Sequence, residues 1–141
     1  MFKTIVWATD GSENADRALS VAKTLAHESD ASLLVAHVVQ RYATESGLAV
    51  YPDEEQLKTR LERVVDDLSG EGLDASLKIV DHVGPQPAHE IADLARETGA
   101  DLIVLGTRGH TAMLGLLLGS VTQRLLHVAP CPVLAVPAEQ P

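Results

Sequence analysis

The chain has 141 residues, of which 45% are apolar, 22% charged and 3% aromatic, and its formal net charge is −9. The length fits one domain over residues 1–141, and the apolar share is enough for a buried core. The negative charge disfavours binding to nucleic acid or to an anionic membrane, and the scarcity of aromatic residues disfavours a base-stacking surface. Without a secretory signal or an apolar run of about 20 residues, we expect a cytoplasmic protein.

The first part of the chain predicts two buried strands joined by a helix. Residues 3–9 form a short apolar run that ends at the turn Thr9-Asp10-Gly11-Ser12. Ser12 suits the N-cap of a helix whose apolar residues recur at helical spacing from Ala15 to Ala26. Asp30 marks a turn, and residues 32–39 are continuously apolar, as expected for a strand buried on both faces.

The middle of the chain predicts a long loop followed by a second helix. Residues 40–53 show no clear period and contain Gly47 and Pro52, so we expect a loop of the length typical of functional lids and mobile segments. The helix that follows is closed by Gly70 and Gly72. Its apolar positions lie on one face: Leu57, Leu61, Val64, Val65 and Leu68.

The second half continues the alternation of strands and helices. Residues 74–81 predict a strand, and the turn Gly84-Pro85-Gln86-Pro87 leads into a helix that ends near Gly99. Residues 102–105 predict the next strand, a helix begins at Ser120, and the last strand is Val133 to Val136. Strict alternation with helical crossovers implies an α/β fold with a parallel sheet covered on both faces.

The segment from Gly106 to Ser120 carries the pattern G-x2-G-x9-G-S after a strand and at the start of a helix. Gly106 allows a sharp turn, and Gly109 allows the backbone to approach a ligand. Gly119 and Ser120 stand where free N–H groups and the helix dipole favour an anion, so phosphate is the predicted ligand. The glycine spacing and the missing lysine exclude a P-loop, and the position after a late strand excludes a dinucleotide fingerprint.

This pattern resembles the nucleotide-binding signature of the universal stress protein family over about residues 2–137. The turn at residues 9–12, the strand end His37-Val38, the helix start at residues 119–122 and the final strand at residues 132–136 strengthen the resemblance. It implies an open five-stranded parallel sheet in the order 3-2-1-4-5, Rossmann-like and similar to the adenine nucleotide alpha hydrolases. The carboxyl ends of strands one and four would then meet at the topological switch point, where ligands bind in such sheets.

The resemblance also implies a ligand, which is ATP or another adenine nucleotide, and its contacts. Val38 would meet adenine through its backbone, and a Mg2+ ion between Asp10 and the phosphates is chemically favourable. The residues implied around the ribose and phosphates are Ala8, Thr9, Asp10, Gly106, Arg108, Gly109, Gly119, Ser120, Val121 and Thr122.

Several alternatives remain open from the sequence. Asp10 could cap the following helix, Gly106 could be an ordinary turn glycine, and Arg108 could be a solvated charge. The single cysteine, Cys131, excludes an intrachain disulfide and is expected to be packed.

We expect a nucleotide-responsive binding module of the stress response. One alternative is a slow ATPase or nucleotide-dependent phosphotransferase. We favour binding over catalysis because efficient phosphoryl transfer needs more cationic groups than this site offers. The other is an interaction protein with a vacant pocket. The apolar last strand, Val133 to Val136, predicts a homodimer through an exposed sheet edge.

Overall fold

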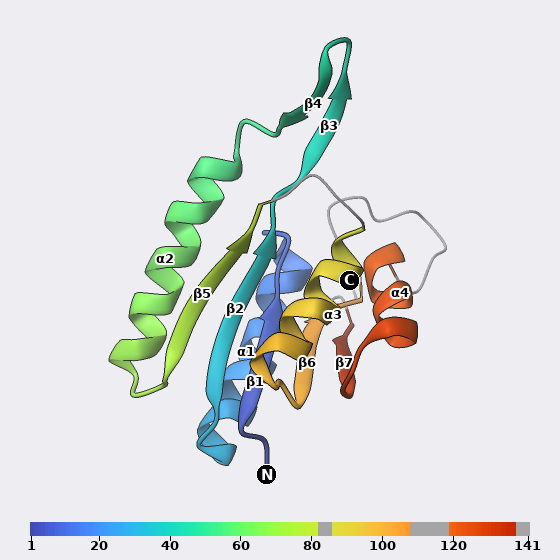
Figure 1. Ribbon diagram of the computed structural model, residues 1–141. Helices are drawn as coiled ribbons and strands as arrows, with labels where there is room; N and C mark the ends of the chain where they lie inside the picture. Colours follow the sequence, from blue (N-terminus) through green and yellow to red (C-terminus); the bar gives the residue numbers. More distant parts are fainter. Residues whose placement is uncertain (82–85, 108–118, 138–141) are drawn as a thin grey trace.

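The computed structural model describes residues 1–81, 86–107 and 119–137, and it shows an α/β fold built on one parallel sheet (Figure 1). The sheet order is β5-β2-β1-β6-β7. In chain order these five strands are numbered 3-2-1-4-5, which confirms the predicted order. The strands are β1 Thr4–Ala8, β2 Ser32–Val38, β5 Ala75–Val80, β6 Leu102–Gly106 and β7 Val133–Val136.

Helices cover both faces of the sheet, as predicted. Helix α1 (Glu13–Ser29) and helix α2 (Glu54–Gly70) pack on one face, and α3 (Pro87–Thr98) and α4 (Ser120–Val128) pack on the other. Successive residues of β1 point to opposite faces of the sheet and belong to different cores. Trp7 packs in the core under α1 and α2, and Val6 packs in the core under α3 and α4. Within the described ranges, no helix combines the length and apolar character needed to cross a bilayer.

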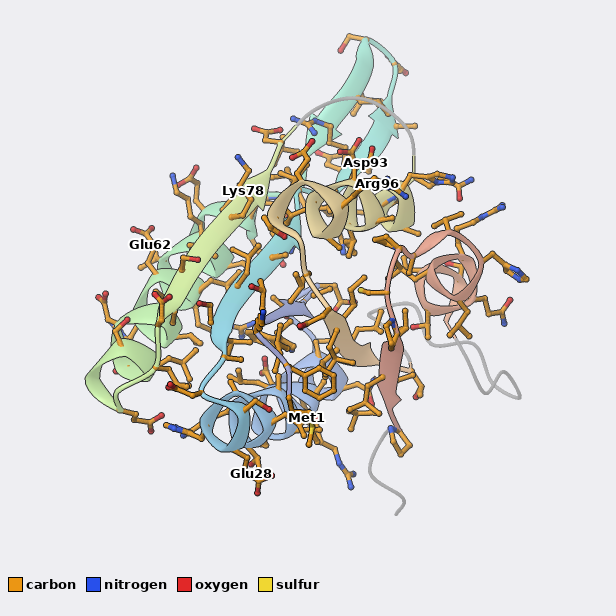
Figure 2. All side chains as sticks on the ribbon, turned by 60° about the horizontal axis from the view of Figure 1, so that its bottom comes forward. Met1, Glu28, Glu62, Lys78, Asp93 and Arg96 are labelled. Atoms are coloured by element: carbon orange, nitrogen blue, oxygen red, sulfur yellow. The ribbon has the colours of Figure 1, made fainter. Side chains whose placement is uncertain are left out.

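Many charged side chains lie on the outside of this layered arrangement, whereas Glu90 on α3 is buried. Figure 2 shows Glu28, Glu62, Asp93 and Arg96 on the outer sides of their helices, and all four are exposed. Asp93 and Arg96 form an ion pair of 2.9 Å one helical turn apart. The apolar side chains between the helices and the sheet therefore supply the burial that stabilises the fold.

The helix ends follow the chemistry of their terminal residues. Ser12 is the N-cap of α1, and its hydroxyl accepts the N–H of Ala15 at 3.2 Å, as predicted. Asp30 ends that helix with a φ of 55°. Pro87 opens α3, and Gly99 closes it in the left-handed conformation.

The expectation of a structureless loop over residues 40–53 is wrong. Strands β3 (Arg41–Thr44) and β4 (Gly47–Val50) form an antiparallel hairpin that extends away from the main sheet beyond the end of β2 (Figure 1). Tyr42 and Tyr51 contact each other near its base, with ring centroids 5.0 Å apart. Because both faces of the hairpin are largely exposed, its residues carry no alternation of apolar and polar types by which the strands could be predicted.

Candidate functional site

The carboxyl ends of β1 and β6 lie side by side at the point where the strand order reverses. Pairing of β1 with β6 runs to Trp7 and Val104, and pairing with β2 runs to Ala8 and Ala36. Successive strands are added on one side of β1 from β2 to β5 and on its other side from β6 to β7. The carboxyl ends of β1 and β6 therefore mark the topological switch point of the sheet, where open α/β proteins bind ligands.

The turn after β1 is fixed by its own side chains. The Thr9 hydroxyl accepts the N–H of Gly11 at 3.0 Å, and the Asp10 carboxylate accepts the N–H of Ser12 at 3.0 Å. Gly11 has a φ of 86°, which a residue with a side chain adopts only under strain. Since Ser12 is the helix cap, Asp10 shapes the turn and does not cap α1 itself.

Gly106 ends β6 and packs against the first turn of α1. A Cβ at this position would overlap the side-chain amide of Asn14. Its φ does not lie in the left-handed region, so close packing, and not a turn, explains the glycine. The Thr122 hydroxyl donates to the Gly106 carbonyl at 2.9 Å, and this bond joins the start of α4 to the end of β6.

The start of α4 lies beside the same strand end. Gly119 is the N-cap, with φ −71° and ψ 161°, and its N–H donates to the Thr107 carbonyl. The N–H groups of Ser120, Val121 and Thr122 belong to the first turn, where a helix offers no internal acceptor. Ser120 is exposed, whereas Thr122 is buried with its hydroxyl already bonded within the fold. Arg108 and Gly109 lie outside the described residues.

Val38 is the last residue of β2. Its backbone N–H and C=O groups point toward the β1 side of the strand, at a level beyond the end of β1. The Ala36 carbonyl accepts from Thr9 on the β1 side, and the Val39 N–H donates to Val80 on the β5 side. Backbone groups alternate in direction along a strand, so those of Val38 point the same way as those of Ala36. Pairing with β5 continues to Val38, two residues beyond Ala36, the last residue of β2 that pairs with β1.

The sequence analysis missed a buried polar pair beneath this edge. The His37 ring is 2% exposed; its Nδ1 lies 2.7 Å from the Thr9 carbonyl oxygen, and its Nε2 lies 2.8 Å from Glu54 Oε2. Glu54 Oε1 also accepts the N–H of Gln40 at 3.0 Å. No local pattern in the sequence connects His37 with Glu54, because their contact depends on where α2 lies relative to β2.

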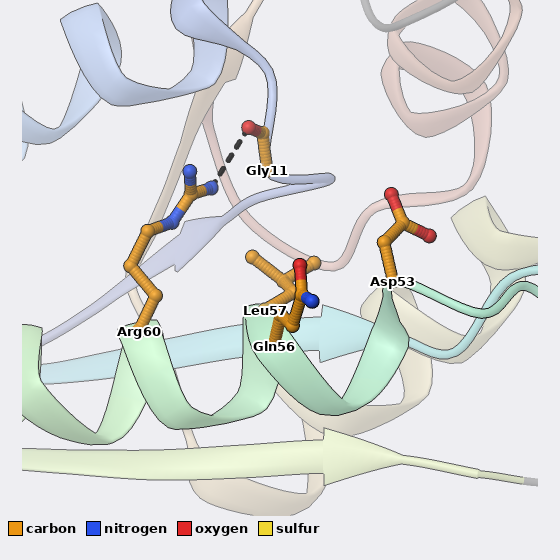
Figure 3. Close-up of a pocket in the computed structure, with 5 residues that line it drawn as sticks. All are labelled: Gly11, Asp53, Gln56, Leu57 and Arg60. Carbon is orange, nitrogen blue, oxygen red and sulfur yellow. Dashed lines mark hydrogen bonds between the residues drawn. The ribbon is translucent and has the colours of Figure 1, made fainter.

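A shallow depression lies between the β1–α1 turn and the start of α2 (Figure 3). Its volume is about 240 Å³, below the roughly 300–1,000 Å³ of typical ligand pockets. The Arg60 guanidinium donates to the Gly11 carbonyl at 2.8 Å across it. The sequence analysis assigned none of the α2 residues that line it to the site: Asp53, Gln56, Leu57 and Arg60.

The β1–α1 turn carries negative charge. Partial burial raises the pKa of the Asp16 carboxyl; the Arg60 guanidinium opposes this rise, and the charges of Asp10 and Glu13 add to it. In the part of the chain that the structure describes, no group of three or more His, Cys, Asp or Glu side chains could hold a metal ion.

Taken together, the strand ends gather most of the predicted site at one edge. The end of β1, the last residue of β6 and the first turn of α4 are joined by hydrogen bonds and pairing, and the end of β2 lies next to β1. An open parallel sheet with helices on both faces and a switch point at β1 defines a doubly wound α/β fold.

Comparison with known proteins assigns this architecture to a family. The universal stress protein family matches residues 1–137, and the chain belongs to that family. A universal stress protein of Thermus aquaticus is 42% identical over 140 residues, covering 96% of this chain and 99% of the relative.

Two solved structures share this fold. The universal stress protein UspA from Lactobacillus plantarum has a TM-score of 0.77 at 23% identity, over 95% of this chain and 97% of its own, and supports the fold alone. A universal stress protein in complex with cAMP has a TM-score of 0.70 at 30% identity, over 96% of this chain and 97% of its own.

Proposed function

We propose that residues 1–141 form a single domain that binds an adenine nucleotide, with ATP as the first candidate, and acts as a nucleotide-responsive module in the stress response. The observation that carries this proposal is the meeting of three chain segments at the switch point of the sheet. The turn after β1, the end of β6 and the start of α4 converge there, held by pairing and by the Thr122 bond to Gly106. The complex of a 30% identical relative with cAMP supports an adenine ligand.

The proposed contacts divide between base and phosphates. The backbone of Val38 would read adenine, since an N–H and a C=O side by side match the acceptor N1 and the donor N6 of that base. Ala8, Thr9 and Gly106 would line the ribose. The phosphates would lie on the first-turn N–H groups of α4 and the Ser120 hydroxyl, where the helix dipole favours an anion. Arg108 and Gly109 keep their predicted role of wrapping the phosphates.

The proposed Mg2+ ion would be held jointly by protein and ligand. Asp10 offers one carboxylate, which suits a cation that keeps most of its ligands as water and phosphate oxygens. A titration with ATP in the presence and absence of Mg2+ tests this role. Mg2+ should increase the affinity for ATP, and Asp10→Asn should remove most of that increase; equal affinity with and without the ion would refute it.

Calorimetric titration with ATP, ADP, AMP, cAMP and GTP tests the proposed ligand. We expect micromolar-range binding of at least one adenine nucleotide and weaker binding of GTP. Measurement of phosphate release in the same samples separates a binding module from an ATPase, and we expect turnover well below about 1 per second. Absence of heat for every adenine nucleotide would overturn the proposal.

We also propose that the chain forms a homodimer through β7. Among the residues that the structure describes, this strand pairs with β6 alone and lies at the edge of the sheet, and Leu134 on it is 37% exposed. An exposed apolar edge invites antiparallel pairing with a second copy. Light scattering should give a dimeric mass, and Leu134→Lys should shift it toward the monomer. A monomeric mass for the unaltered chain would contradict this.

A further inference from the structure

We propose that His37 and Glu54 are positioning residues of the nucleotide site, which make the backbone of Val38 available to the adenine base. The inference rests on the proposed function and extends it to residues that do not touch the ligand. It begins with the way the ladder between β1 and β2 ends.

The parallel ladder between β1 and β2 stops at Ala36, two residues before β2 ends at Val38. Its last rung is the bond of 2.9 Å from the Thr9 N–H to the Ala36 carbonyl. The next rung of a parallel ladder would join the Val38 N–H to the Thr9 carbonyl. In the structure this carbonyl accepts from His37 Nδ1 at 2.7 Å. The imidazole thus donates to the same carbonyl oxygen to which the ladder would otherwise extend.

The hydrogen-bond chemistry of the ring shows why Glu54 is needed. A carbonyl oxygen only accepts, so Nδ1 must donate to Thr9. The contact of 2.8 Å between Nε2 and the Glu54 carboxylate is a hydrogen bond only if a proton lies between them. Glu54 therefore fixes the orientation of a ring that is almost fully buried.

Glu54 also connects this ring to the chain on both sides of the hairpin. Its second oxygen accepts the Gln40 N–H at 3.0 Å, and it is the first residue of α2. The Glu54 carboxylate thus ties the segment just after Val38 to the start of α2. With its side chain 11% exposed, the pair is shielded from solvent, which strengthens its hydrogen bonds. Val38 lies between two residues that Glu54 holds.

Three substitutions test this role. Glu54→Leu removes both hydrogen bonds. Glu54→Gln preserves them, because its amide NH2 can donate to a neutral Nε2 while its amide oxygen accepts from Gln40. Glu55→Leu is the matched control, since Glu55 is the exposed neighbour on the same turn of α2. Glu54→Ala replaces Glu54→Leu if leucine disturbs the start of the helix.

The measurements are affinities for ATP and GTP, with thermal unfolding to verify that each variant is folded. We expect Glu54→Leu to weaken ATP binding roughly tenfold and to reduce the preference for ATP over GTP. The affinity of Glu54→Gln for ATP should stay within about threefold of that of the unaltered chain, because this variant loses at most part of the energy of one hydrogen bond. Glu55→Leu should change neither quantity. A change in base preference separates positioning from a general loss of stability.

Three results would overturn the proposal. If Glu54→Leu binds ATP with unchanged affinity and preference, the pair does not position the site, although nucleotide binding itself would stand. If Glu54→Gln loses as much affinity as Glu54→Leu, charge and not hydrogen-bond geometry is responsible. If the unaltered chain binds no nucleotide, the proposed function fails and this role fails with it.

Discussion

The two edges of the sheet use aspartate differently. At the amino edge, the Asp101 carboxylate accepts the backbone N–H groups of Lys3 at 2.9 Å and Thr4 at 3.2 Å, and the Asp101 N–H donates to Thr4. At the carboxyl edge, the Asp10 carboxylate accepts the N–H of Ser12 in a turn that follows β1, beside the end of β6. At the amino edge one residue thus joins the starts of β1 and β6, whereas the carboxyl edge gathers several strand ends around a common point.

The difference follows from the position of each aspartate relative to its strand. Asp101 precedes β6 and lies where the strands start, so its bonds are used for the fold. Asp10 follows β1 and lies at the switch point, where ligands bind in sheets of this type. The predictions below alter one edge at a time and measure both stability and ligand binding.

The largest effect on binding is expected from Gly119→Val at the carboxyl edge. A branched side chain at the N-cap would crowd the first turn of α4, where the phosphates are proposed to lie, and ATP affinity should fall at least roughly a hundredfold. The backbone of Gly119 has a φ of −71°, so valine fits its conformation and most molecules should stay folded. Calorimetry and circular dichroism measure the two quantities.

The control for this substitution comes from the amino edge. Gly70 ends α2, has no positive φ and has open space around it, so Gly70→Val tests the same change of side chain far from the proposed ligand. ATP affinity should be unchanged in this variant. Equal losses in both variants would show that the binding defect does not arise at α4.

Ser120→Ala should have the next largest effect. The Ser120 side chain is exposed and lies on the first turn of α4, so its hydroxyl can meet a phosphate without a change of fold. Loss of one hydrogen bond to a charged group costs about 1.5–3 kcal/mol, which corresponds to a roughly tenfold to hundredfold loss of affinity. Thr122→Ala provides the contrast: its buried hydroxyl bonds to Gly106, so we expect lower stability. An unchanged affinity in Ser120→Ala would remove this hydroxyl from the site.

Asp101→Ala should lower stability and leave nucleotide binding intact. The substitution removes the acceptor of two backbone N–H groups, one of them partly buried, and we expect a loss of about 1–2 kcal/mol in the free energy of unfolding. Urea unfolding monitored by circular dichroism gives this value, and ATP titration gives the affinity. A binding defect as large as that of Ser120→Ala would show that the two edges are coupled.

Much of the fold could be predicted from local patterns. The cap at Ser12, the turn at Asp30 and the strand order follow from residue types and from the resemblance, and the structure confirms them. The hairpin could not be predicted because its exposed strands carry no apolar period. The reason for Gly106 was also hidden, since its neighbour Asn14 belongs to another element.

The candidate site shows the same limit. Its glycine pattern and the turn at Asp10 are local, so the sequence indicated them. The pair of His37 and Glu54 and the contact of Arg60 with Gly11 join segments that meet only after folding. Residue spacing along the chain carries no information about such contacts unless a family resemblance supplies it.

The smallest effect concerns Cys131 at the amino edge. This residue packs against the cluster beneath α3 and α4, as predicted, and burial raises the pKa of its thiol, with the negative charge of Asp101 adding to the rise. Since the thiolate is the reactive form, alkylation at neutral pH should be several-fold slower in the folded chain than in the unfolded chain. The ratio of the alkylation rate of the unfolded chain to that of the folded chain should fall toward one as the pH rises above the thiol pKa of the folded chain.

Asp101→Asn separates the two causes of the raised pKa of the Cys131 thiol, which are burial and the charge of Asp101. The substitution removes the charge and keeps the shape of the side chain, so alkylation of the folded chain should become faster, by less than about threefold because solvent screens a half-exposed pair. Iodoacetamide labelling followed by mass spectrometry measures the rate in each variant. Asp10→Asn, at the opposite edge, should leave the rate unchanged. If both substitutions change the rate equally, the net charge of the chain, and not the position of Asp101, governs the thiol, and the contrast between the two edges does not extend to Cys131.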